Sequence, residues 1–232
     1  MKTTVIVLLV VLLLATAAMS ADQSSWRVSI KADNGAGMNP SAGAYIGVYP
    51  TSLEGLDAED GSPYAGFFVD LPGVAMHVAA LVPGAGLYSR SIKSPTLPVP
   101  EKTWDLYVAA NVNSTSNMIR LLAFTTIGLQ TPTFDGLPVR YYMRLADNKG
   151  KPGAPANGTT WELPIATTSS ATPFWTSPVN LPIIRLSAAT NAALLAEGYK
   201  LQFVQKAVPE PSGLLALGGC LVGLAGFIRR RR

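Results

Sequence analysis

The sequence predicts a mainly β protein: a single antiparallel β-sandwich domain over residues 24–206, flanked by an N-terminal signal peptide and a C-terminal single transmembrane helix. Three observations predict this organisation. Short segments of the central region alternate apolar and polar residues with a period of two. Turns rich in Gly, Pro, Asn and Asp separate these segments. Long apolar runs occur in the segments before and after this region.

Residues 1–20 have the three parts of a secretory signal peptide. Lys2 supplies the positive start, residues 5–14 form the apolar part, and small residues follow. Ala18 and Ser20 best meet the small-x-small rule, so we expect cleavage before Ala21. An uncleaved N-terminal anchor is the alternative.

The strand pattern is clearest in four segments. In the first, Trp26, Val28 and Ile30 alternate with polar residues and are expected to face the core. The inward faces expected in the other three are Trp104, Leu106, Val108, Ala110 and Val112; Val139, Tyr141, Met143 and Leu145; and Tyr199, Leu201 and Phe203. Further short strands are expected at residues 45–49, 66–71, 77–82, 118–124 and 182–186. Many short strands joined by Gly- and Pro-containing turns are typical of a sandwich.

One short helix is expected within residues 187–198, with Ser187 as its N-cap and Gly198 just past its end. The three prolines within residues 93–102 indicate either a long connection inside one domain or a linker between two small domains. We favour one domain, because neither side has enough expected strands to close a core of its own.

Charge in the central region is balanced. Lys2 and the four arginines at 229–232 account for five of the 18 Lys and Arg residues, and Glu210 is one of the 14 acidic residues. This leaves 13 cations and 13 anions between Ala21 and Ala207. A neutral body lacks the basic stripe that phosphate neutralisation needs, so no nucleic-acid partner is expected.

Few residues of the central region suit catalysis, and we expect no enzymatic activity. His77, the single histidine, lies in an alternating segment and is expected to be a strand residue with local partners. Cys220, the single cysteine, lies in the C-terminal apolar run, so the central region can form neither a disulfide nor an ordinary zinc site. No G-x-S-x-G nucleophile elbow is present.

Carboxylates gather in one short segment, where Glu54, Asp57, Glu59 and Asp60 fall within seven residues. Calcium binds several oxygen ligands, and an acidic loop outside the cell can supply them, so these four are the candidate metal ligands. Calcium is the single cofactor that the sequence suggests, and the spacing does not match an EF-hand. The alternative is a solvated acidic loop.

Aromatic residues outside the alternating segments are candidates for stacking against sugars. Trp161 precedes a Thr-, Ser- and Pro-rich segment, and Trp175 lies within it, whereas Trp26 and Trp104 are assigned to the core. With carboxylates such as Asp57 or Asp60, this surface would make a secreted carbohydrate-binding or carbohydrate-active protein, which is the alternative function.

Residues 208–232 combine three elements. Pro209, Glu210 and Pro211 resist helix formation and are expected to be extended and exposed. Residues 213–228 form an apolar run of 16 residues, which as a helix is about 24 Å long and spans a bilayer if the flanks adapt. The run is followed by the membrane stop, which the positive-inside rule leaves in the cytoplasm; its residues are Arg229, Arg230, Arg231 and Arg232.

This order of elements resembles the PEP-CTERM sorting signal of bacterial proteins that exosortase processes. The resemblance implies a Gram-negative-type bacterium, transient insertion into the inner membrane, cleavage near Pro209–Pro211, and delivery to the cell surface or extracellular matrix. Because the body carries no catalytic motif, we expect an exported, non-catalytic structural or adhesive β-sandwich. Exopolysaccharide is a candidate partner, and a permanent single-span anchor is the alternative for the tail.

Overall fold

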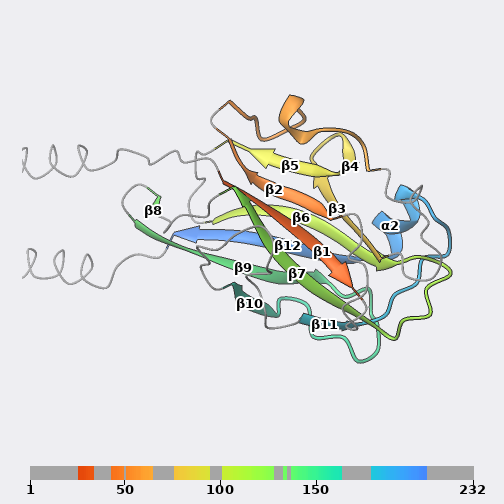
Figure 1. Ribbon diagram of the computed structural model, residues 1–232. Coiled ribbons are helices and arrows are strands. Elements are labelled where there is room, and N and C mark those ends of the chain that lie inside the picture. The colour runs from red at the N-terminus through yellow and green to blue at the C-terminus, as the bar shows by residue number, and fades with distance from the viewer. Residues whose placement is uncertain are drawn as a thin grey trace, which may run out of the picture. The chain divides into compact units, whose positions relative to one another are not determined.

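The computed structural model describes residues 26–33, 43–49, 51–64, 76–94, 101–127, 133–134, 137–163 and 179–207. These residues form a mainly β protein, as expected, with little helix (Figure 1). The strands are β1 Trp26–Asp33, β2 Ala44–Val48, β3 Met76–Val82, β4 Gly86–Tyr88, β5 Arg90–Lys93, β6 Glu101–Ala110, β7 Met118–Ile127, β8 Thr133–Phe134, β9 Leu137–Asp147, β10 Thr160–Leu163, β11 Val179–Pro182 and β12 Tyr199–Ala207. The helices are the 3₁₀ turn η1 Ala58–Asp60 and the α-helix α2 Asn191–Glu197.

The strands form two sheets. The first has five strands in the order β11-β7-β1-β2-β5, and the second has the path β10-β9-β12-β6-β3-β4, with β8 paired to β9. Among the described strands, β2 and β5 pair in parallel, from Tyr45 opposite Arg90 to Val48 opposite Lys93, and the other strand pairs are antiparallel. The sheets are therefore antiparallel-rich, which corrects the expectation of purely antiparallel pairing.

The chain divides into two compact units. Residues 23–131 and 140–206 form the larger unit, which holds the five-stranded sheet and most of the second sheet. The other unit comprises residues 1–22, 132–139 and 207–232, and its described residues form the short pairing of β8 with the first residues of β9. Within the larger unit, β1 pairs with β7 in one sheet and β3 pairs with β6 in the other. Each sheet therefore contains strands from before and from after residues 95–100. A domain boundary at the proline-rich segment does not fit this pairing.

The two sheets of the larger unit pack through a cluster of aromatic rings. Trp26 of the five-stranded sheet lies with its ring centroid 5.2 Å from that of Trp104, 5.5 Å from Tyr141 and 5.8 Å from Phe203. Those three residues belong to β6, β9 and β12 of the second sheet, and all four are buried. The contacts of Trp26 with Trp104 and Tyr141 are edge-to-face, a geometry that adds to the hydrophobic free energy of burial. The alternating residues thus face a shared core between the sheets.

The inward faces expected from the sequence are confirmed with one exception. The expected inward residues of β1, β9 and β12 are buried, as are Trp104, Leu106, Val108 and Ala110 of β6. The prediction that Val112 faces inward is wrong. β6 ends at Ala110, and Val112 lies in the following turn with 41% of its surface exposed. The strand expected at 182–186 is also misplaced, because β11 ends at Pro182 and only an isolated bridge joins Arg185 to Ala110. The strand expected at 66–71 lies outside the described residues.

The expected helix forms but begins later than predicted. Its N-cap is Thr190, whose hydroxyl accepts a hydrogen bond from the Ala193 backbone N–H at 3.1 Å. Gly198 follows its last residue, as expected. Ser187 instead lies in the preceding turn, where its backbone N–H and its hydroxyl both donate to the Glu197 carboxylate. A threonine three residues closer to the apolar helical residues therefore replaces serine as the cap.

Candidate functional site

The acidic segment folds into a compact loop around η1. Asp57 is the N-cap: its Oδ1 accepts from the Glu59 N–H at 2.8 Å and its Oδ2 accepts from the Leu53 N–H at 2.6 Å. In return, the Asp57 N–H donates to Asp60 Oδ2 at 2.9 Å, which completes a capping box. Two of the four candidate metal ligands thus hold the loop's own backbone.

Asp60 is the buried member of this group, with 1% of its surface exposed. Its Oδ1 accepts from the Ile92 N–H of β5 at 2.9 Å, so one carboxylate joins η1 to the strand at the edge of the five-stranded sheet. Burial raises the pKa of Asp60 above its usual value, while the backbone N–H groups of Ile92 and Asp57 act in the opposite direction. The carboxylate is therefore a structural connection between loop and sheet.

Glu54 is used differently, as the partner of two lysines, of which Lys102 is buried. Its carboxylate accepts from Lys102 Nζ and from Ser94 Oγ (3.2 Å), and Lys93 Nζ lies 3.7 Å away. The Lys102 side chain is 1% exposed and also donates to the Ser94 carbonyl oxygen. Burial lowers the pKa of Lys102, and Glu54 counteracts this by stabilising the ammonium form. The contact ties the loop to β6 of the second sheet.

The geometry of these carboxylates gives no support to the predicted calcium site. Oxygens of Asp57 and Asp60 accept hydrogen bonds from backbone N–H groups, and Glu54 faces two lysines. Within the described ranges, no group of three or more His, Cys, Asp or Glu side chains is placed to hold a metal ion. Calcium remains a prediction from the sequence. Glu59, the fourth candidate, is half-buried in η1.

Replacing Asp60 with Asn tests the structural role of its carboxylate. The amide keeps one acceptor oxygen but turns an NH₂ group toward a backbone N–H, so we expect Asp60→Asn to lower the free energy of unfolding by about 1–2 kcal/mol. Glu59→Gln is the matched control on the same turn, expected to change it by less than about 0.5 kcal/mol. Urea denaturation of both variants measures the difference; equal effects would contradict the structural role.

His77 lies in β3, as expected, and is 1% exposed. Its Nδ1 lies 3.1 Å from the Tyr64 hydroxyl, and the Tyr64 carbonyl oxygen accepts from Asn191 Nδ2 of α2 at 3.1 Å. Burial raises the pKa of Tyr64 well above its usual range, so this hydroxyl stays protonated and available as a hydrogen-bond partner. The histidine therefore takes part in a buried polar contact with Tyr64.

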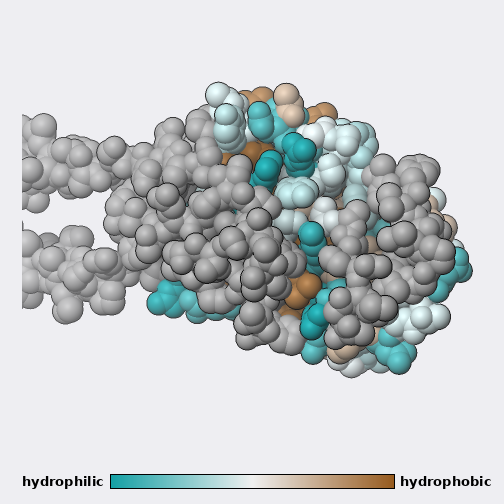
Figure 2. Space-filling view, viewed as in Figure 1, coloured by the Kyte–Doolittle hydropathy of each residue, from teal (hydrophilic) through white to brown (hydrophobic). Residues whose placement is uncertain are grey.

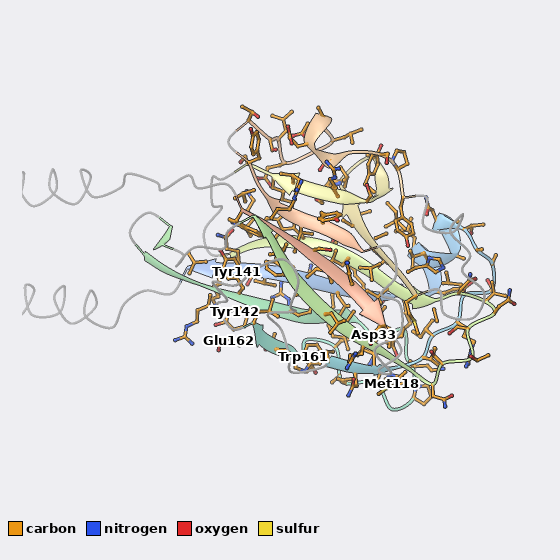
Figure 3. The ribbon with its side chains drawn as sticks, viewed as in Figure 1. Asp33, Met118, Tyr141, Tyr142, Trp161 and Glu162 are labelled. Carbon is orange, nitrogen blue, oxygen red and sulfur yellow. The ribbon has the colours of Figure 1, made fainter. Side chains whose placement is uncertain are left out.

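Trp161 lies in β10, the edge strand of the second sheet, opposite Met143. It is half-buried, and the next residue, Glu162, points to the opposite face, where its Oε1 lies 3.2 Å from Arg140 Nη1. Figure 3 labels Trp161 and Glu162. The loop with Asp57 and Asp60 packs against β5 of the five-stranded sheet. β5 contacts β3 of the second sheet, and β10 lies at the other end of that sheet, so the structure does not bring Trp161 next to these carboxylates (Figure 1). Trp175, the other stacking candidate, lies outside the described residues.

A cationic and aromatic group on the five-stranded sheet was missed by sequence reasoning. Tyr45 of β2 lies opposite Ser29 of β1 and Arg90 of β5, and the Arg27 guanidinium carbon lies 5.4 Å from the centre of the Tyr45 ring. Alternation does place Arg27 and Tyr45 on outward faces. The pairing that puts Arg90 beside Tyr45 is parallel and joins segments 45 residues apart, and it leaves no local signal in the sequence.

The sorting tail and the membrane stop lie outside the described residues, so Pro209, Glu210, Pro211 and Arg229–Arg232 remain predictions. The helices that the structure does describe are too short or too polar to span a bilayer. Comparison of the chain with protein-family models, with curated proteins and with solved structures finds no match.

Proposed function

We propose that this chain is an exported cell-surface or extracellular-matrix protein with a non-catalytic, structural or adhesive β-sandwich over residues 24–206. Residues 1–20 direct export, residues 213–228 hold the chain briefly in the inner membrane, and an exosortase-type enzyme processes it near Pro209–Pro211. The observation that carries the proposal is the order Pro-Glu-Pro, apolar run and arginine cluster in the tail, combined with an N-terminal signal peptide.

The polar side chains of the body support a non-catalytic role. A glycoside hydrolase needs two carboxylates that face one another across the sugar. Asp57 and Asp60 instead bond to backbone N–H groups of their own loop and of β5. His77 is buried against Tyr64. Asp57, Asp60 and His77 therefore have structural roles, and no two of them form a nucleophile–base pair.

Processing of the tail is the direct test of the proposal. We expect the intact mass of the mature secreted protein to lack residues 1–20 and about 20 residues of the tail, because both segments carry sorting chemistry. Glu210→Ala should leave export unchanged and keep the uncleaved chain in the membrane fraction. Glu162→Ala, which removes the same side chain from an exposed strand, is the control and should be processed normally.

Two outcomes would contradict this scheme. A mature mass that still includes Arg229–Arg232 would indicate a permanent anchor in place of a sorting signal. Normal release of the Glu210→Ala variant would show that the processing enzyme does not recognise this position.

A further inference from the structure

Four strands lie at the ends of the two sheets: β5 and β11 in the first, β4 and β10 in the second. The segment before β3 covers β4, because the Tyr64 N–H donates to the Leu87 carbonyl oxygen at 2.9 Å. The loop with η1 covers β5, because the Ile92 N–H donates to Asp60. This loop lies above β5 in Figure 1, and its residues form the upper edge of the view in Figure 2. Two of the four edges are thus occupied by the chain itself.

The other two edges differ in their sequence. β11 ends in Pro182, a residue without an N–H, which is a common protection of edge strands. β10, Thr160–Leu163, contains no proline, glycine or lysine, and its one charged side chain, Glu162, is paired with Arg140. Among the described residues, only those of β9 pair with β10, and Thr160 and Glu162 are exposed. β10 is therefore the edge at which a further strand can add.

The direction of the backbone groups of β10 follows from its first contact with β9. The Leu145 N–H donates to the Thr159 carbonyl oxygen at 2.9 Å, and the register places Trp161 two residues further along the same ladder. In an antiparallel pair, alternate residues direct their N–H and C=O groups to the same neighbour. Trp161 therefore bonds to β9, whereas Thr160 and Glu162 direct their backbone groups away from β9.

We propose that β10 pairs with β10 of a second copy of this chain, antiparallel about a twofold axis at Trp161. The outward backbone groups of Thr160 then bond to those of Glu162 of the other copy, and the reverse contact is identical by symmetry. Both strands are four residues long, so neither leaves an unpaired extension. The pairing joins the second sheets of the two copies into one sheet. This inference goes beyond the proposed function and does not depend on the sorting tail.

The side chains are compatible with this register. Trp161 lies opposite the buried Met143, so its half-buried ring is on the core side of the sheet. At the axis, the two Trp161 residues form a non-hydrogen-bonded pair, with Cα atoms about 4.5 Å apart, and cover each other's exposed surface. On the outer side, each Glu162 lies opposite Thr160, and the two Glu162 residues are diagonal neighbours about 7–8 Å apart. Like charges therefore do not lie directly opposite one another.

The small size of this edge indicates what the pairing can do. Two residues of each strand supply backbone hydrogen bonds, and the contact is smaller than the interface of a stable dimer. Pairing of two free copies is therefore expected to be weak. Many copies held on one surface would make many such contacts at high local concentration, and weak contacts of this kind add up. Self-pairing through β10 would thus connect copies of a surface or matrix protein to one another.

Disulfide trapping of the full-length chain, purified in mild detergent, tests the register. All variants carry Cys220→Ser, which removes the single native cysteine. Trp161→Cys puts two Cα atoms about 4.5 Å apart, within the range that a disulfide spans, whereas Glu162→Cys puts them beyond about 7 Å. We expect Trp161→Cys to form the linked dimer at least about tenfold faster under mild oxidation. Chance collisions would give the opposite order, because Glu162 is the more exposed residue.

A backbone variant tests the hydrogen bonds of the edge. Glu162→Pro removes an N–H that points away from β9, so the fold should be retained, and disulfide formation by Trp161→Cys should slow at least about tenfold. The matched control Glu162→Val keeps the N–H and should change the rate by less than about twofold. Circular dichroism melts confirm that each variant is folded.

Three results would overturn the proposal. Equal rates at positions 161 and 162 would contradict the register, and a rate that Glu162→Pro leaves unchanged would contradict backbone pairing. Hydrogen exchange shows whether the edge is covered within one chain: the Thr160 and Glu162 amides should exchange fast in dilute protein and more slowly as its concentration rises. Slow exchange at every concentration would overturn self-pairing. Processing of the tail is measured separately, so the proposed function stands or falls on its own.

Discussion

Trp104→Ala is expected to lower the free energy of unfolding by about 3–5 kcal/mol, the range for removing a large aromatic residue from a core. Trp104 is fully buried, and its ring lies 5.2 Å from Trp26 and 5.8 Å from Phe203. These rings come from β1 and β12, so the substitution opens a cavity between the two sheets. Urea denaturation followed by tryptophan fluorescence measures the change.

Two further variants separate volume from polarity at this position. Trp104→Phe keeps most of the ring volume and removes an indole N–H that has no hydrogen-bond partner among the described residues, so its cost should stay below about 2 kcal/mol. Trp161→Ala, at the half-buried edge strand, is expected to cost about 1 kcal/mol. If Trp104→Ala cost no more than Trp161→Ala, the aromatic cluster would not be the centre of the core.

The aromatic core could be predicted because its information is local. Each of Trp26, Trp104, Tyr141 and Phe203 lies in a segment with a period of two, and a strand puts alternate side chains on one face. Which faces meet depends on sheet order, which alternation does not encode. Alternation therefore did not predict the burial of Tyr107 and Ala109, which lie on the face of β6 opposite Trp104 and Leu106.

The parallel pairing of β2 with β5 shows a second limit. A parallel pair needs a long connection, and the chain between these strands contains η1, β3 and β4. Neither strand sequence specifies the direction of its partner. This pairing brings Arg90 next to Tyr45.

The acidic loop was found from composition, but its role depends on distant residues. Asp60 bonds to Ile92, 32 residues along the chain, and Glu54 bonds to Lys102, 48 residues along. Clustered carboxylates suggest a cation, and the structure supplies lysine ammonium and backbone N–H groups as partners. Sequence spacing alone cannot distinguish these partners from a metal ion.

Glu54→Ala is expected to lower the free energy of unfolding by about 2–3 kcal/mol at pH 7. Removing one member of a buried pair leaves the other charge without compensation, at a cost of about 3–5 kcal/mol when both are buried. The Glu54 side chain is 52% exposed, and solvent screening reduces this cost. Lys102→Met, which removes the buried charge itself and keeps much of the volume, should lie within about 1 kcal/mol of the unsubstituted chain.

The double variant Glu54→Ala/Lys102→Met should be more stable than Glu54→Ala alone, because no uncompensated ammonium remains. This non-additivity identifies the pair as coupled. Additive effects, or a Lys102→Met variant less stable than Glu54→Ala, would show that Lys102 stabilises the fold independently of its carboxylate partner.

The pH dependence of Glu54→Ala provides the strongest test of the buried lysine. Folding lowers the pKa of Lys102 below its usual 10.5, so the folded chain binds this proton less tightly than the unfolded chain does. The corresponding stabilisation is complete above 10.5 and is lost as the pH falls through the lower folded pKa. Glu54 normally raises the folded pKa of Lys102. Removing Glu54 therefore widens the pH range between the folded and unfolded pKa values, over which stability depends on pH. The deficit of Glu54→Ala relative to the unsubstituted chain should therefore shrink between pH 7 and pH 10.5, and in the Lys102→Met background the effect of Glu54→Ala should stay constant over the same range.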